Sequence, residues 1–188
     1  QRSIERRAVD DATRPVFLWA DEAQNFVSSY DQQFATTCRG ARVALVYLTQ
    51  NCSNFVAALG GSDKGRAETD SLFANLNTKI LHANGDPVTN QWAATLIGRT
   101  RQHFANSSAS HGGSEWVASA LGFGQPGQQS AGMSESYEFA VQPGSFSELR
   151  TGGPENSWQV DAVLFQSGKT MSATGRPWMP VTFDQRSK

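Results

Sequence analysis

The chain has 188 residues, with 16 lysines and arginines against 17 aspartates and glutamates, and a formal net charge of −1. Its length fits one domain with a substantial buried core. Its balanced charge gives no reason to expect a strong polyanion-binding surface, so a nucleic-acid role would need a local site or an oligomer. Cys38 and Cys52 form no CxxC pair, so we expect a protein of the reducing cytoplasm. No stretch has the roughly 18 apolar residues of a membrane span, so we expect any membrane anchor to lie outside this chain.

Three apolar runs predict strands at Val16–Ala20, Val43–Leu48 and Thr78–His82. The first two runs are continuous rather than alternating, which is typical of strands buried on both faces of a parallel sheet. Between the runs, the pattern predicts helices at Tyr30–Cys38 and about Asp63–Asn75. This strand, helix, strand, helix, strand order predicts a βαβ arrangement and an α/β fold.

The next predicted helix has the clearest boundaries. Asp86 is a helix N-cap residue, and Pro87 follows at the first helical position. Gly98 ends the helix. Its apolar stripe consists of Val88, Trp92, Leu96 and Ile97.

The composition changes from residue 100 to residue 136, where Gly, Ser, Gln, Asn and Ala dominate. We expect a mobile insertion here, with one short helix at about Glu115 to Leu121. Beyond it, β-like segments separated by turns predict a small antiparallel addition at the sheet edge; they are Tyr137–Val141, Gln159–Gln166 and Met179–Phe183. We therefore expect one domain with a core half at 1–99, an insertion at 100–136 and a β-rich tail at 137–188.

Two carboxylates, Asp21 and Glu22, directly follow the first apolar run. This is the form of a Walker B segment, in which a buried strand delivers the first carboxylate to nucleotide-bound Mg²⁺ and the second orients or deprotonates the attacking water. An ordinary strand end that turns into a helix explains the pair equally well.

The second apolar run ends in Thr49 and Gln50. Open α/β sheets bind ligands at the carboxyl ends of their strands, so Gln50 is a candidate sensor of a γ-phosphate, with polar strand capping as the alternative. Arg39, just before that run, is a candidate arginine finger across a subunit interface. A solvated arginine at a helix end is the alternative for Arg39.

A phosphate loop needs Gly-x-x-x-x-Gly-Lys-Ser/Thr between a strand and a helix. The chain has Gly-Lys-Thr only at 168–170, with Val163 at the position of the first glycine. Pro177 and Pro180 then exclude the helix that the motif requires. The sequence therefore predicts a hairpin turn at 167–170.

Several blocks together resemble the TraG/TraD family of type IV secretion coupling proteins, which are FtsK/HerA-like P-loop ATPases. The resemblance covers about Val16 to Gly98 well and the rest loosely. The blocks that carry it are Asp21–Phe26, Cys38–Arg42, Val46–Asn51, Leu72–Ile80 and Asn84–Pro87.

The resemblance implies the C-terminal half of a RecA-like parallel sheet, including the region that recognises the relaxosome protein TraM. It implies that Asp21 binds Mg²⁺ and nucleotide, that Glu22 is catalytic and that Gln50 senses the nucleotide. Arg39 is implied as the arginine finger, although Arg42 is equally placed. The implied cofactors are ATP and Mg²⁺, held by the full-length protein.

For the longer protein, the resemblance implies a homo-hexamer anchored in the bacterial inner membrane. Its implied partners are single-stranded DNA, the relaxase or a relaxosome accessory protein, and the type IV secretion channel. In the family the phosphate loop precedes the Walker B strand, and the sequence starts at Gln1 rather than at Met. We therefore expect a part of the ATPase that is inactive alone. The alternative function is a non-catalytic module that docks an accessory protein or a secretion substrate.

Overall fold

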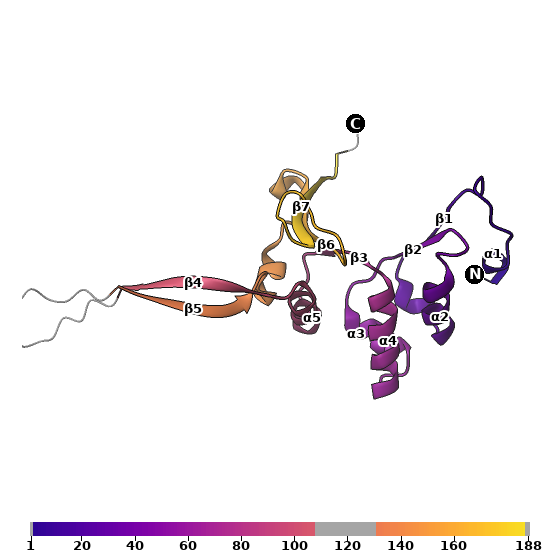
Figure 1. The fold of residues 1–188 in the computed structure, drawn as a ribbon, viewed down its shortest axis with the longest axis horizontal. Helices are drawn as coiled ribbons and strands as arrows, with labels where there is room; N and C mark the ends of the chain where they lie inside the picture. The colour runs from indigo at the N-terminus through magenta and orange to yellow at the C-terminus, as the bar shows by residue number, and fades with distance from the viewer. Residues whose placement is uncertain (1, 108–130, 187–188) are drawn as a thin grey trace, which may run out of the picture.

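The computed structural model describes residues 2–107 and 131–186 (Figure 1). No helix in these two ranges is long and apolar enough to cross a membrane. In chain order the elements are α1 (Arg2–Glu5), β1 (Val16–Ala20), η1 (Ala23–Asn25), α2 (Ser29–Thr37), β2 (Val43–Tyr47), α3 (Cys52–Ala58), α4 (Asp63–Asn75), β3 (Thr78–His82), α5 (Pro87–Ile97), β4 (Arg99–Ser107), β5 (Ala131–Phe139), η2 (Pro143–Glu148), η3 (Pro154–Asn156), β6 (Gln159–Gln166) and β7 (Trp178–Asp184).

Strands β1 and β2 form a two-stranded parallel sheet, with Val16 beside Val43 and Ala20 beside Tyr47. One face of this sheet packs against α2, where the side chain of Phe34 is completely buried. Helices α2, α3 and α4 all lie on the same side of the strands (Figure 1). The parallel pair and its helices confirm the predicted α/β class.

The other face of the β1–β2 sheet is open. Phe17 and Trp19, which point to it, are 59% and 70% exposed. The prediction that both strands are buried on both faces is therefore wrong for this chain. The physical reason is that the helices of the described residues cover one face and leave the other bare.

Strand β3 pairs antiparallel with β6, and β6 pairs antiparallel with β7. The predicted βαβ order thus holds for the first two strands, while the third strand belongs to a separate three-stranded sheet. Leu81 of β3 packs with Val163 and Phe165 of β6 in an apolar cluster that also takes in Phe146, and this packing fixes the pairing. The predicted antiparallel segments at Gln159–Gln166 and Met179–Phe183 are confirmed in β6 and β7.

The predicted helix boundaries are confirmed for α4 and α5. The Asp86 carboxylate accepts hydrogen bonds from the amides of Val88 and Thr89, each at 3.2 Å, so it caps α5 as its sequence position predicts. Gly98 ends the helix with φ +95°, a conformation that favours glycine. The short helix α3 had no clear signal in the sequence.

The predicted insertion begins and ends as a β-hairpin. Strands β4 and β5 pair antiparallel from Arg99 beside Phe139 to Ser107 beside Ala131, and the hairpin projects away from the rest of the protein (Figure 1). Tyr137, where a β-like segment was predicted to begin, lies in β5. The helix predicted at about Glu115 to Leu121 lies outside the described residues.

The Gly-Lys-Thr sequence at 168–170 lies in the connection between the antiparallel strands β6 and β7. Gly168 has φ +73°, and the Lys169 amide donates to the Gln166 carbonyl at 3.3 Å. The predicted turn is thus confirmed, and the segment has neither the preceding glycine nor the following helix of a phosphate loop.

Candidate functional site

The chain segments that follow β1 and β2 meet at the carboxyl end of the parallel pair. The Leu48 amide donates to the Ala20 carbonyl at 2.9 Å, and the Ala23 amide donates to the Leu48 carbonyl at 2.9 Å. These backbone bonds continue past the strand ends, so the side chains of the two following loops are held close together. We refer to this region as the carboxyl edge.

Glu22 lies at the centre of the carboxyl edge. Its backbone adopts the left-handed conformation, with φ 49° and ψ 47°, which is uncommon for a residue with a side chain. Such backbone strain persists where the surroundings fix it and clusters at functional sites. Here it turns the chain sharply out of β1 and leads directly into η1.

Two amide side chains hold the Glu22 carboxylate. Gln50, which follows β2, donates from Nε2 to Glu22 Oε1 at 2.9 Å, and Gln24 donates from Nε2 to Oε2 at 2.5 Å. Thr49 Oγ1 in turn donates to Gln24 Oε1 at 2.9 Å. The four side chains form one hydrogen-bonded network across the two loops.

The network favours the ionised form of Glu22. The hydrogen bond from Gln24, followed by that from Gln50, lowers the pKa of the Glu22 carboxyl group below its usual value. At neutral pH the group is therefore an anionic acceptor of hydrogen bonds. A water molecule that approaches this carboxylate can be oriented by it.

Asp21 lies beside the network and is exposed. Its Oδ1 accepts a hydrogen bond from the Glu22 amide at 2.9 Å, while Oδ2 has no hydrogen bond to another described residue. The described residues contain no group of three or more His, Cys, Asp or Glu side chains that could hold a metal ion by itself. An exposed carboxylate with a free oxygen nevertheless fits Mg²⁺, which binds through one or two carboxylates together with phosphates and water.

Asn84, which follows β3, extends the carboxyl edge. Its Nδ2 donates to the Gln50 carbonyl at 2.6 Å, and its own carbonyl accepts a hydrogen bond from Asn90 Nδ2 at 2.9 Å. Nearby, Thr89 Oγ1 accepts from the Cys52 amide at 2.9 Å and donates to the Asp86 carboxylate at 2.7 Å. The start of α5 is thereby tied to the loop that carries Gln50.

Sequence reasoning proposed no function for Gln24 or Asn84. Both residues lie inside the sequence blocks that resemble the family, but an isolated Gln or Asn has no pattern that distinguishes a site residue from an ordinary polar residue on the surface. The only available signal was position, since each residue follows a predicted strand by two to four positions. Their hydrogen bonds to the Glu22 and Gln50 loops come from the fold.

Arg39 lies away from this network. It precedes β2, whereas the network follows β2, so Arg39 lies toward the opposite edge of the sheet and is exposed. Arg42 holds the N-terminal segment instead, because its guanidinium donates to the carbonyls of Asp11 and Thr13 at 2.9 and 2.8 Å. Between the two candidates, Arg39 is the one whose side chain makes no hydrogen bond or ion pair with another described residue.

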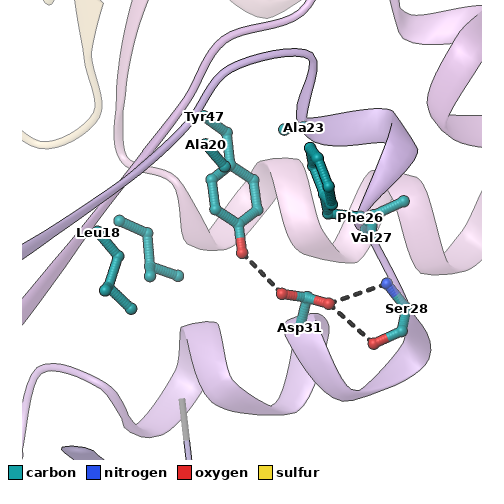
Figure 2. A pocket seen from close by; sticks show the side chains of 9 residues that line it. Leu18, Ala20, Ala23, Phe26, Val27, Ser28, Asp31 and Tyr47 are labelled. Carbon is teal, nitrogen blue, oxygen red and sulfur yellow. Dashed lines mark hydrogen bonds between the residues drawn. The ribbon is translucent and has the colours of Figure 1, made fainter.

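A cavity of about 320 Å³ lies between the β1–β2 sheet and the segment that joins η1 to α2. Its polar end is Asp31, which is 5% exposed. Figure 2 shows Tyr47 and Ser28 converging on that carboxylate; Tyr47 Oη donates to Oδ1 at 2.8 Å, and Ser28 donates through its amide at 2.9 Å and through Oγ at 2.8 Å, both to Oδ2. These bonds fix β2 against α2 directly ahead of the Gln50 loop. The hydrogen bonds at the polar end of the cavity therefore stabilise the packing of β2 on α2.

Comparison with protein families gives a match over most of the chain. A family model described as the TraM recognition site of TraD and TraG matches residues 15–140. This range includes the whole carboxyl edge. Among curated proteins, no match was found.

Two solved structures of conjugative coupling proteins share the fold. The bacterial conjugative coupling protein TrwBdeltaN70, in its unbound monoclinic form, aligns with a TM-score of 0.67 and 17% identity over 99% of this chain and 35% of that chain. The plasmid coupling protein TrwB in complex with the non-hydrolysable GTP analogue GDPNP aligns with a TM-score of 0.63 and 17% identity over 99% of this chain and 34% of that chain. The chain thus spans about a third of the length of these structures.

Proposed function

Because the chain belongs to the family of the TraM recognition site of TraD and TraG, we propose that it forms part of the motor of a conjugative coupling protein and supplies half of its ATP site. One observation carries this proposal. Glu22 and Gln50, which follow neighbouring parallel strands, are joined by a 2.9 Å hydrogen bond at the edge where α/β sheets bind ligands. The TrwB structure in complex with a GTP analogue supports a nucleotide site in a protein of the same fold.

In this proposal each residue of the carboxyl edge has a separate task. Asp21 would hold Mg²⁺ through its exposed carboxylate, where the ion would supply positive charge against the phosphates. Glu22, ionised and fixed by Gln24, orients the attacking water and accepts its proton. Gln50 links Glu22 to the γ-phosphate, so that loss of the phosphate changes its hydrogen bond to Glu22.

The proposal leaves the phosphate loop and the arginine finger to other parts of the assembly. The described residues contain no Walker A segment, so the phosphates must be held by a different segment or subunit. Arg39, exposed and toward the opposite sheet edge, acts only across an interface with another subunit, as in a hexamer. An inner-membrane anchor, single-stranded DNA, a relaxase and a type IV secretion channel belong to the proposal for the longer protein.

ATP hydrolysis by the polypeptide that the complete gene encodes tests this function. We expect Glu22→Gln to lower the rate by about 10²–10⁴-fold, the usual contribution of a positioned general base. Glu68→Gln is the matched control, because Glu68 lies on α4, outside the carboxyl edge, and forms an ion pair with Lys64 at 3.8 Å. Equal rates for the Glu22→Gln and unmodified proteins would refute the assignment. The 188-residue chain alone is expected to show no turnover.

A second candidate function is docking of a relaxosome accessory protein. The observation that favours it is the family description itself, which names TraM recognition. If this is the function, the residues of the carboxyl edge only stabilise the fold, and the chain binds its partner without catalysis. Binding of the accessory protein to the 188-residue chain, together with unchanged hydrolysis in the Glu22→Gln variant of the longer protein, would favour docking over the motor.

A further inference from the structure

The side chain of Asn84, in the loop between β3 and α5, makes two hydrogen bonds of opposite kind. Its Nδ2 donates to the Gln50 carbonyl at 2.6 Å, and its Oδ1 accepts a hydrogen bond from the Asp86 amide at 2.7 Å. The two contacts need one donor and one acceptor, which an amide side chain supplies. A carboxylate of the same shape would keep the acceptor for Asp86 and lose the donor to Gln50.

The backbone of Asn84 is bonded to α5 and to η2. Its carbonyl accepts hydrogen bonds from Asn90 Nδ2 at 2.9 Å and from Ser147 Oγ at 3.1 Å. Its amide donates to the Phe146 carbonyl at 3.2 Å. Asn90 and Phe146 are only 5% and 1% exposed, so both belong to the interior. Because a protein interior is close-packed, a shift of Asn84 has to be matched by a shift of α5 and η2.

The β4–β5 hairpin is rooted in the same two elements and projects away from them (Figure 1). Strand β4 begins at Arg99, directly after α5, and the Ala140 amide that follows β5 donates to the Gly98 carbonyl at 3.0 Å. Phe139 packs against the apolar cluster that contains Phe146 of η2. The nine residues of β4 at about 3.3 Å each make a lever of about 30 Å, so a rotation of about 5° at the root moves its described end by about 2.6 Å.

We propose that Asn84 is a positioning residue that relays the position of the Gln50 loop to the β4–β5 hairpin. The inference rests on the proposed function, in which loss of the γ-phosphate changes the contact between Gln50 and Glu22. Because the Gln50 carbonyl is bonded to Asn84, that loop moves only by breaking the 2.6 Å bond or by displacing α5 and η2 with it. The hairpin then takes a different angle in the two nucleotide states.

Amide hydrogen exchange in peptides from β4 and β5 tests the relay in the polypeptide that the complete gene encodes. Exchange is compared in saturating adenylyl imidodiphosphate and in saturating ADP, both with Mg²⁺. We expect exchange at the root of the hairpin to differ by at least about 5-fold between the two states, the lower end of the usual coupling between two sites. In the Asn84→Asp variant, which lacks the donor to Gln50, we expect a difference below about 2-fold.

Two other variants separate the relay from a loss of structure. Asn156→Asp is the matched control, because Asn156 Nδ2 donates to the Gly152 carbonyl at 3.0 Å in η3, outside the carboxyl edge. It removes the same kind of bond and is expected to keep the full difference between the nucleotide states. Ser147→Ala is a milder variant at an exposed position, which removes one bond to the Asn84 carbonyl and is expected to reduce the difference.

A purely structural role for Asn84 predicts that Asn84→Asp speeds exchange in the hairpin by the same factor in both nucleotide states. That pattern, or a difference that persists in full in both Asn84→Asp and Ser147→Ala, would overturn the proposal. Equal exchange in the two states of the unmodified protein would overturn the relay alone, if Glu22→Gln still lowers hydrolysis. Hydrolysis that does not depend on Glu22 would refute the proposed function and the relay with it.

Discussion

The substitution Tyr47→Phe removes a single hydroxyl group and with it the hydrogen bond from Tyr47 Oη to the Asp31 carboxylate at 2.8 Å. Asp31 is only 5% exposed, so water does not readily replace the lost donor. Ser28 still donates twice to the other oxygen of Asp31. A hydrogen bond to a buried charged group contributes about 1.5–3 kcal/mol, so we expect the free energy of unfolding to fall by about 2 kcal/mol and Tm by about 4–8 °C.

Urea denaturation followed by circular dichroism measures this loss, with the slope of the transition checked for constancy. Tyr30→Phe is the matched control, because the Tyr30 hydroxyl donates to Glu5 on the exposed surface. The control is expected to lower stability by less than Tyr47→Phe does. A change in the free energy of unfolding within about 0.5 kcal/mol for Tyr47→Phe, or equal changes for the two variants, would contradict the prediction. Burial would then not strengthen the hydrogen bond from Tyr47 to Asp31.

Two further predictions concern local packing and titration. Gly65→Ala is expected to lower the free energy of unfolding by about 1–3 kcal/mol, because an added Cβ would lie 2.7 Å from the Leu59 carbonyl oxygen. Gly144→Ala is the control for the same denaturation assay. No atom lies within 4 Å of a Cβ added at Gly144, so this variant should lack the clash. Burial raises the pKa of the Cys52 thiol from 9.0 to about 11, so between these pH values the folded chain keeps a proton that the unfolded chain loses. The free energy of unfolding should therefore fall as the pH rises above about 9. The Cys52→Ala variant should show a flatter pH dependence of its urea midpoint.

The sequence was sufficient to predict local features with strong chemical causes. Asp86 and Gly98 marked the ends of α5 because capping depends on a few adjacent residues. Glu22 and Gln50 could be placed at one edge because each follows an apolar run, and parallel strands align their carboxyl ends. Their hydrogen bond is what this reasoning leads one to expect.

The features that were missed depend on partners distant in the chain. The Thr78–His82 run predicted a strand but carried no information that β6, more than 70 residues later, would be its neighbour. The apolarity of Phe17 and Trp19 predicted burial, although the described residues provide no cover. The polar composition of β4 and β5 concealed the hairpin, since the two strands pair with each other and Phe139, at the base of the hairpin, packs against a core cluster.

The central claim is that Glu22 and Gln50 work as one unit in ATP hydrolysis. A double-mutant cycle in the polypeptide encoded by the complete gene measures this directly, using single-turnover hydrolysis by Glu22→Gln, Gln50→Ala and the double variant. We predict that the double variant is little slower than Glu22→Gln alone, because Gln50 acts through the carboxylate that it contacts at 2.9 Å. Rate losses that simply multiply in the double variant, or no loss in either single variant, would contradict the account.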